Sequence, residues 1–234
     1  MSLWQVLGIT DIPRIVFYRS FHVLSFAVLA AFALICATRY KISRSAGAIY
    51  ALLIYGALFA TMYLISWIGI ALGFGFRLVS SQVALFVPIP AALLAKKSGL
   101  STLEGCDFTA PALYLARAVG KIGCLIYGCC YGRPWAHGIY SHVQNVKAIP
   151  LPLYESISCL LIACITVYAA KRRGYHAGGR AYGISLILLG IVRYLVILAT
   201  PDVFNDQSIT AVVMVLLGLV LLYHAEHPLW KKIS

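Results

Sequence analysis

The chain has 234 residues, of which 62% are hydrophobic and only 11% are charged. Soluble domains carry about 25% charged residues, so this composition excludes an ordinary water-soluble protein and favours one that lies in a membrane. We expect the formal net charge of +12 to reflect membrane topology and attraction to anionic lipid headgroups rather than binding to nucleic acid.

Long apolar runs predict an all-α integral membrane protein with about seven transmembrane helices, because about 20 apolar residues span a bilayer. In chain order, the expected helices lie near Ile15–Thr38, Ala46–Phe76, Leu78–Ala95, Phe108–Tyr131, Leu151–Ala170, Gly179–Ala199 and Ile209–Tyr223. Only Arg77 separates the second run from the third. A six-span alternative, in which one of these two segments is re-entrant, therefore stays open. No long linker or internal repeat is visible, so residues 1–234 are expected to form a single transmembrane domain.

The connections between the expected helices differ in their content of lysine and arginine. One alternate set, together with the C-terminal tail, is rich in cations: Arg39, Lys41, Arg44, Lys96, Lys97, Lys171, Arg172, Arg173, Arg180, Lys231 and Lys232. The other set has fewer: Arg14, Arg77, Arg133 and Lys147. Cytoplasmic loops carry the excess of cations, so we expect the N-terminus outside and the C-terminus in the cytoplasm. Residues 1–13 lack the basic region of a secretory signal, so the first span is expected to be retained.

Ionisable residues inside the spans are the first candidates for function. Each costs at least about 2.5–3.5 kcal/mol at mid-membrane unless it is paired or hydrated. They are Arg19, Arg117, Lys121, Glu155 and Arg193. Four cations and one carboxylate leave positive charge in a low-dielectric place, which predicts an anionic ligand such as a lipid phosphate. Two alternatives stay open: Arg19 can snorkel to the interface, and Arg117 can pair with Tyr114.

The fourth expected helix ends in the glycine-rich sequence GKIGCLIYGCCYG, from Gly120 to Gly132. Glycine at positions such as 120, 123 and 128 allows close approach of a backbone. Tight helix packing explains these residues by itself. The alternative is a backbone opened near the outer end, whose N–H groups bind a lipid headgroup, and on this reading Gly120, Gly123 and Gly128 belong to the substrate-binding set.

Seven cysteines are present, mostly inside the expected helices. Free cysteine is among the most buried residue types, so small buried hydrophobic residues are the simplest interpretation. A zinc site made by Cys124, Cys129 and Cys130 with His137 or His142 is the alternative, but the spacing fits no usual four-ligand pattern. We therefore expect neither a metal nor a cofactor.

Several segments resemble motifs of the prolipoprotein diacylglyceryl transferase family. GKIGCLIYGCCYG resembles the GRxGNFxNGE-type signature of that family, and PLPLYES, at 150–156, resembles its HPxQLYE stretch. YGISLILLGIVRYLVILATPD, at 182–202, resembles its YG...RFxxEFxRxPD segment. The order and spacing hold over most of the chain. The resemblance implies a bacterial plasma-membrane enzyme with seven spans, which moves diacylglyceryl from phosphatidylglycerol to the lipobox cysteine thiol of a preprolipoprotein and releases glycerol phosphate.

The resemblance also implies roles for individual residues. Arg193 matches the essential arginine of the sixth segment, Glu155 matches the glutamate of LYE, and Tyr18 matches a tyrosine of the first span. Lys121 occupies the place of the signature arginine, and Arg19 and Arg117 are expected to assist it in binding the lipid.

The sequence also departs from the family pattern. Cys124 stands in place of the signature asparagine, Cys129 in place of its glutamate, and Ile197 in place of a carboxylate. The His-Gly-Gly of the family falls near residues 81–83, where this chain has no histidine. His22, four residues after Tyr18, is then the candidate base for the acceptor thiol. The alternative function is a non-catalytic protein that binds or transports anionic lipids.

Overall fold

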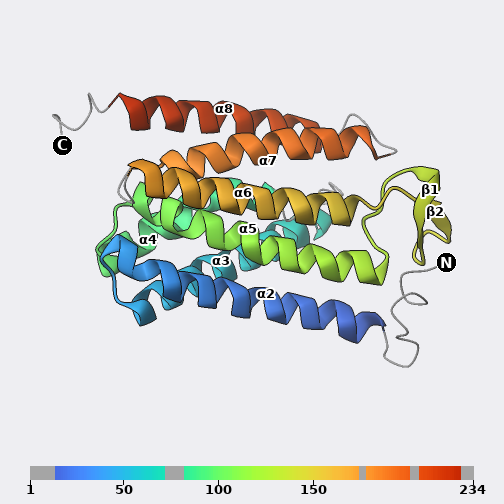
Figure 1. Cartoon of the computed structure of the whole chain (residues 1–234), viewed down its shortest axis with the longest axis horizontal. Coiled ribbons are helices and arrows are strands. Elements are labelled where there is room, and N and C mark those ends of the chain that lie inside the picture. Colours follow the sequence, from blue (N-terminus) through green and yellow to red (C-terminus); the bar gives the residue numbers. More distant parts are fainter. Residues whose placement is uncertain (1–13, 72–81, 174–177, 201–205, 228–234) are drawn as a thin grey trace.

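The computed structural model describes residues 14–71, 82–173, 178–200 and 206–227. Helices dominate the described chain, and two short strands lie between the helices α5 and α6 (Figure 1). The elements are α2 (Arg14–Cys36), η1 (Ala37–Tyr40), α3 (Arg44–Ala71), η2 (Gln82–Phe86), α4 (Pro88–Ser98), α5 (Thr102–Tyr127), β1 (Pro134–Ser141), β2 (Val146–Ala148), α6 (Leu151–Arg173), α7 (Arg180–Leu198) and α8 (Asp206–Glu226).

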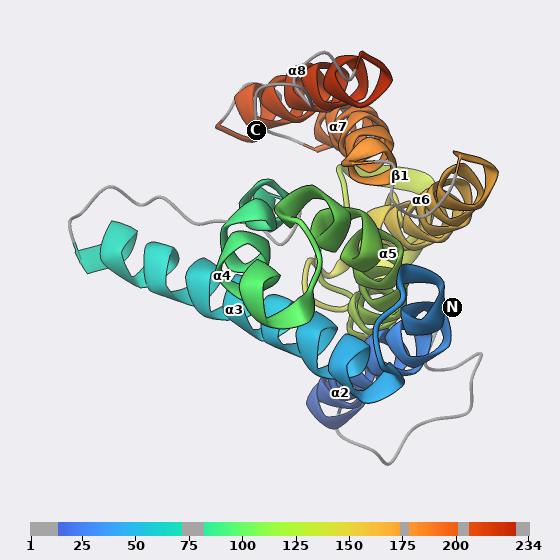
Figure 2. The same cartoon turned by 90° about the vertical axis from the view of Figure 1, so that its left-hand side faces the viewer.

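Most of the helices run roughly along the long axis of the molecule and alternate in direction, whereas α3 runs obliquely across the bundle (Figures 1 and 2). The start of α2 and the end of α8 consequently lie at opposite ends of the bundle, with the two strands at the same end as the start of α2 (Figure 1). α5 is the central helix, which contacts α2, α3, α4, α6 and α7. The end-on view shows it between α2 on one side and α6 and α7 on the other (Figure 2).

Five helical segments of the described chain are long and apolar enough to cross a membrane. They are Ile15–Tyr40, Arg44–Ile65, Leu151–Arg172, Arg180–Leu198 and Gln207–Glu226. α5 is 26 residues long but contains Glu104, Asp107, Arg117 and Lys121. These polar groups are tolerated because the surrounding helices cover most of α5 and provide partners for its charges.

Local signals explain where α5 begins and ends. At its start, Ser101 and Glu104 form a capping box: the Glu104 N–H donates to Ser101 Oγ at 3.3 Å, and the Ser101 N–H donates to Glu104 Oε2 at 2.9 Å. At its end, Gly128 adopts a left-handed conformation with φ of 89°. The helix therefore begins six residues before the expected Phe108 and ends four residues before the expected Tyr131.

The expected third span, Leu78–Ala95, was wrong as a single helix. The described part of this region contains the short η2 and then α4, which has 11 residues. At 1.5 Å per residue α4 is about 16 Å long, about half the thickness of the hydrocarbon core. α3 is described as far as Ala71, and its expected end at Phe76 lies among residues 72–81, outside the described chain.

A two-stranded antiparallel hairpin is the other departure from the all-α expectation. β1 and β2 pair Ile139 with Ala148 and Ser141 with Val146. The hairpin closes over the end of α5, because Ser141 Oγ donates to the Gly128 carbonyl at 2.7 Å and Gln144 Nε2 donates to the Tyr131 carbonyl at 3.2 Å. These bonds fix the loop that contains two of the cysteines.

The helix α7 takes its N-terminal cap from another helix. Its own N-cap residue, Gly179, has no side chain to accept a hydrogen bond. Asp107 on α5 accepts instead from the N–H groups of Gly179 and Tyr182, both at 2.8 Å. This buried carboxylate satisfies donors that a helix start leaves without partners, and it fixes the start of α7 against α5.

Candidate functional site

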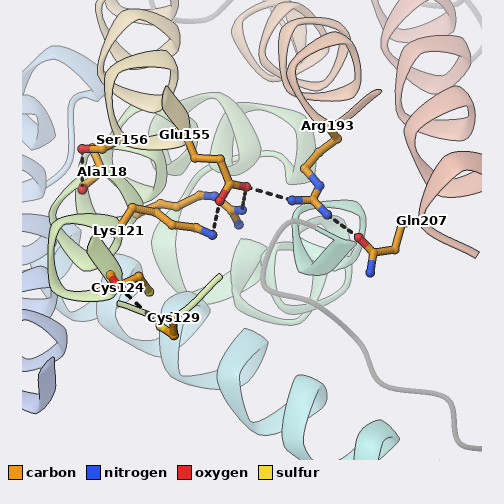
Figure 3. Close-up of polar contacts among 9 residues, drawn as sticks. Ala118, Lys121, Cys124, Cys129, Glu155, Ser156, Arg193 and Gln207 are labelled. Atoms are coloured by element: carbon orange, nitrogen blue, oxygen red, sulfur yellow. Dashed lines mark hydrogen bonds and ion pairs between the residues drawn. The ribbon is translucent and has the colours of Figure 1, made fainter. Parts of the chain in front are cut away.

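Glu155 on α6 is the centre of a buried cluster of charges. Glu155 is only 3% exposed. Arg193 Nη1 contacts Glu155 Oε1 at 2.8 Å, Arg117 Nη2 contacts the same oxygen at 3.5 Å, and Lys121 Nζ pairs with Glu155 Oε2. Figure 3 shows Lys121 and Arg193 approaching this carboxylate from two sides. Four residues singled out in the sequence are thus in direct contact.

Three helices supply these charged groups. Arg117 and Lys121 lie one turn apart on α5 and share one face of that helix. On α6, Ser156 Oγ donates to the Ala118 carbonyl at 2.9 Å, which fixes α6 against the same stretch of α5 and places Glu155 beside the two cations (Figure 3). Arg193 comes from the last third of α7.

Gln207 extends the cluster to α8. Its Oε1 accepts a hydrogen bond from Arg193 Nη2 at 2.5 Å (Figure 3). The guanidinium of Arg193 therefore bridges α6 and α8 and is held in one orientation. Sequence reasoning missed Gln207, because a single amide in the first turn of an apolar helix is also typical of an ordinary helix start.

The described ion pairs of this cluster contain more cations than carboxylates. Arg117, Lys121 and Arg193 share the single carboxylate of Glu155. Such charges are costly in a low-dielectric interior unless an anion is bound. The arrangement is thus suited to an anionic ligand.

A cavity of about 640 Å³ lies directly beside the two α5 cations. Arg117 and Lys121 line it, whereas Glu155 and Arg193 do not and stand behind them. The rest of the wall is mainly apolar or aromatic and includes Phe26, Leu58, Phe59, Met62, Leu113 and Leu189. A cationic region beside an apolar cavity matches a ligand that has a negatively charged head and hydrocarbon chains.

Tyr18, Arg19 and His22 of α2 also line the cavity. The rings of Tyr18 and His22 lie 4.4 Å apart between centroids, and His22 Nδ1 lies 3.0 Å from the Tyr18 carbonyl oxygen. A carbonyl oxygen only accepts, so Nδ1 is the donor and Nε2 of the neutral ring is left as the basic nitrogen. Arg19 is exposed and is not part of the Glu155 cluster.

The three glycines of the expected substrate-binding set have different surroundings. A Cβ at Gly120 would meet no atom within 4 Å, and Gly120 lines the cavity. A Cβ at Gly123 would lie 2.8 Å from Phe21 Cβ, so this glycine permits close packing of α2 on α5. Gly128 provides the left-handed cap. α5 is continuous to Tyr127, so the alternative of an opened backbone does not hold at Gly120 and Gly123; the chain leaves the helix only at Gly128.

The structure brings together the three cysteines at the end of α5. The sulfur atoms of Cys124, Cys129 and Cys130 lie within 4.8 Å of one another. Neither His137 nor His142 belongs to this group. The simplest interpretation of the cysteines, as buried small hydrophobic residues, fits Cys106, Cys124 and Cys159 but not Cys130, which is exposed.

The segment where the sequence resemblance places a His-Gly-Gly contains a structural residue. Gln82 is buried at the start of η2, and its Nε2 donates to Thr210 Oγ1 on α8 at 2.8 Å. Its neighbour at position 81 lies outside the described residues. Gln82 is not among the residues that line the cavity.

Replacing Glu155 with Gln removes the carboxylate that the three cations share. We expect the free energy of unfolding to fall by about 3–5 kcal/mol, as when one partner of a buried ion pair is removed. The measurement is the unfolding transition of the detergent-solubilised protein. Tyr154→Phe, at the exposed neighbouring position, is the control, and an unchanged transition for Glu155→Gln would contradict the central role of this carboxylate.

Comparison with known proteins identifies relatives of this chain. The model of the family described as prolipoprotein diacylglyceryl transferase matches residues 83–224. Proteins named phosphatidylglycerol-prolipoprotein diacylglyceryl transferase are also similar. The one from Azoarcus sp. (strain BH72) is 33% identical over 153 residues, which are 58% of this chain and 56% of the relative. The one from Finegoldia magna is 35% identical over 112 residues, 46% of this chain and 43% of the relative.

The Clostridium tetani protein of the same name is 28% identical over 116 residues, 46% of this chain and 45% of the relative. The chain thus spans about half the length of the curated relatives it matches. The region matched by the family model contains Lys121, Glu155 and Arg193, whereas Tyr18 and His22 precede it. Since this region is more than half of the chain, the resemblance seen in the sequence is confirmed, and the chain belongs to the prolipoprotein diacylglyceryl transferase family.

Proposed function

We propose that this protein transfers diacylglyceryl from phosphatidylglycerol to the cysteine thiol of a preprolipoprotein. The observation that carries this proposal is the apolar cavity with Arg117 and Lys121 in its wall and Glu155 and Arg193 behind them. The names of the relatives supply the donor lipid and the acceptor. The lipid phosphate then lies at the two cations, and the acyl chains occupy the apolar part of the cavity.

The positive charge of the cluster stabilises the released glycerol phosphate more than it stabilises the intact phosphatidylglycerol. Phosphatidylglycerol has one negative charge on its phosphodiester, whereas the released glycerol phosphate approaches two at neutral pH, since the second pKa of a phosphate monoester is about 6. Three cations grouped around one carboxylate attract the second state more strongly than the first. Groups that stabilise charge as it develops on the leaving group accelerate the reaction.

The remaining residues have complementary roles in this proposal. Glu155, together with Gln207, holds Arg193 and the α5 cations in position, since charged side chains of this length need fixed partners to stay pre-organised. His22 is the base that takes the proton of the acceptor thiol, with Tyr18 accepting its Nδ1–H through the backbone. Gly120 leaves room in the cavity wall, and Arg19 attracts the anionic lipid from the edge of the cavity.

The proposed setting is the bacterial plasma membrane, with the start of α2 outside, the end of α8 in the cytoplasm, and residues 1–234 forming one domain. The alternating helix directions support an odd number of crossings, with η2 and α4 in place of a full third span (Figure 1). The ends of α4 and α6 and the starts of α3 and α7 gather most of the cations at one end (Figure 1), as cytoplasmic ends do.

A protease recognition site inserted after Asn145, at the exposed hairpin turn, tests this orientation. In intact spheroplasts, externally added protease is expected to cleave there but not at the same site inserted after Lys41, because only the hairpin faces outward. Cleavage after Lys41 is expected only once the membrane is permeabilised. The reverse pattern would contradict the proposed orientation.

Lys121→Gln tests the binding of the lipid phosphate. A hydrogen bond to a charged group contributes about 1.5–3 kcal/mol, so we expect retention of phosphatidylglycerol to weaken about 10- to 100-fold. Lys121→Arg keeps the charge and adds the bidentate geometry that suits phosphate, so binding should be kept or improved. Lys147→Gln, which removes an exposed cation from β2, is the matched control.

The same preparations decide between the enzyme and the alternative lipid-binding protein. Each is incubated with phosphatidylglycerol and a lipobox peptide, and the diacylglyceryl peptide is measured by mass spectrometry. Product that falls with Lys121→Gln but not with Lys147→Gln supports the transferase. Lipid that is retained without any product would favour the non-catalytic alternative.

His22→Gln tests the proposed base. We expect turnover to fall at least about 100-fold, the usual contribution of a positioned base, while retention of phosphatidylglycerol is unchanged. His137→Gln, on the exposed face of β1, controls for loss of a histidine at the same end of the molecule. Turnover by His22→Gln equal to that of the parent would eliminate this role.

A further inference from the structure

We propose that Cys124, Cys129 and Cys130 form a zinc site with three protein ligands, whose fourth position is open to the cavity and binds the thiol of the acceptor. This inference rests on the proposed function for the identity of the fourth ligand. The metal site itself rests on the three cysteines alone.

The sulfur atoms are close enough to share one ion. In a tetrahedral site the zinc–sulfur distance is about 2.3 Å, so the ligand sulfurs lie about 3.8 Å apart in that geometry. All three sulfur atoms are already within 4.8 Å of one another. Small rotations of the cysteine side chains therefore suffice to close the site.

The end of α5 produces this arrangement through its backbone. The N–H groups of Gly128 and Cys129 both donate to the Cys124 carbonyl, at 3.0 and 3.2 Å. The chain thus turns back over the last helical turn, and Cys129 and Cys130 return to Cys124. The spacing of the three cysteines in the sequence fits no usual zinc motif, but the helix cap brings their sulfur atoms close together (Figure 3 shows Cys124 and Cys129).

Packing alone does not explain this group. Cys106 and Cys159 are buried in the core, as free cysteines usually are. Cys130 is instead exposed and has a φ of 61°, in the left-handed region that favours glycine or asparagine. A cysteine in this conformation points to a requirement for its sulfur at this place.

The surroundings indicate what the open position would bind. Cys124 and Cys130 line the same cavity as Lys121 and His22. A zinc ion with three protein ligands keeps a fourth position for water or substrate, and thiolates are preferred ligands of zinc. The acceptor of the proposed reaction is a thiol, so it can bind there beside the lipid phosphate.

Zinc would also promote deprotonation of the acceptor thiol, because a thiol that coordinates zinc is deprotonated. The family resemblance leaves this step without a residue, since the chain has no histidine near residues 81–83. The S–H proton of the acceptor goes to Nε2 of His22. The bound thiolate sulfur then attacks the diacylglyceryl carbon that carries the phosphoester oxygen. The new C–S bond forms as that C–O bond breaks, and its electron pair leaves with glycerol phosphate, whose charge the α5 cations stabilise.

Cobalt titration tests the metal site without requiring turnover. The full-length protein, purified in detergent under reducing conditions, is stripped with chelator and titrated with Co²⁺. We expect one equivalent to bind with thiolate-to-cobalt absorption and tetrahedral d–d bands, and Zn²⁺ to displace it. Cys124→Ser and Cys130→Ser should each weaken binding at least about tenfold, whereas Cys164→Ser, at an exposed position of α6, should not. Absence of these bands, or equal binding by all variants, would overturn the site.

The fourth ligand is tested by adding a lipobox peptide to the cobalt-loaded protein. A change of the d–d bands with the cysteine peptide, but not with its serine analogue, supports thiol binding at the open position. No change would overturn this part of the inference, as would a disulfide between two of these cysteines in native membranes. A spectral change without diacylglyceryl product would uphold the metal site and contradict the proposed transferase activity.

Discussion

The buried carboxylate of Glu155 is the interaction on which the site depends. It attracts cations from α5 and α7, and Gln207 joins α8 to the same group through Arg193. Each of these charges alone would be costly inside a membrane protein. Together they are stable only in the helix arrangement that brings them within ion-pair distance. The ion pairs of the site and the packing of its four helices therefore depend on each other.

The excess of cations over carboxylates in this cluster favours the binding of an anionic headgroup. If Glu155 neutralised every cation, an anionic headgroup would gain little from the cavity. Three cations contact this one carboxylate, and two of them, Arg117 and Lys121, line the cavity while Arg193 does not. This separates groups that meet the ligand from groups that hold them in place.

The position of α5 links the charged cluster to the cysteine group. A single helix, covered by its neighbours, presents Arg117 and Lys121 to the cavity and then ends in a cap that gathers three sulfur atoms at its wall. The hairpin fixes that cap through Ser141 and Gln144. In the proposed reaction, one end of the cavity therefore holds the phosphate and the adjacent cap holds the thiol.

The sequence by itself determined the membrane class, most helices, the family and the charged residues of the site, because long apolar runs and rare intramembrane charges are strong local signals. It did not determine that Arg117 would join Glu155, that Gln207 would hold Arg193, or that α4 would be too short to span a membrane. Nor did the spacing of Cys124, Cys129 and Cys130 indicate that their sulfurs meet. Those features depend on contacts between helices distant in sequence and on the geometry of one helix cap, which only the tertiary structure specifies.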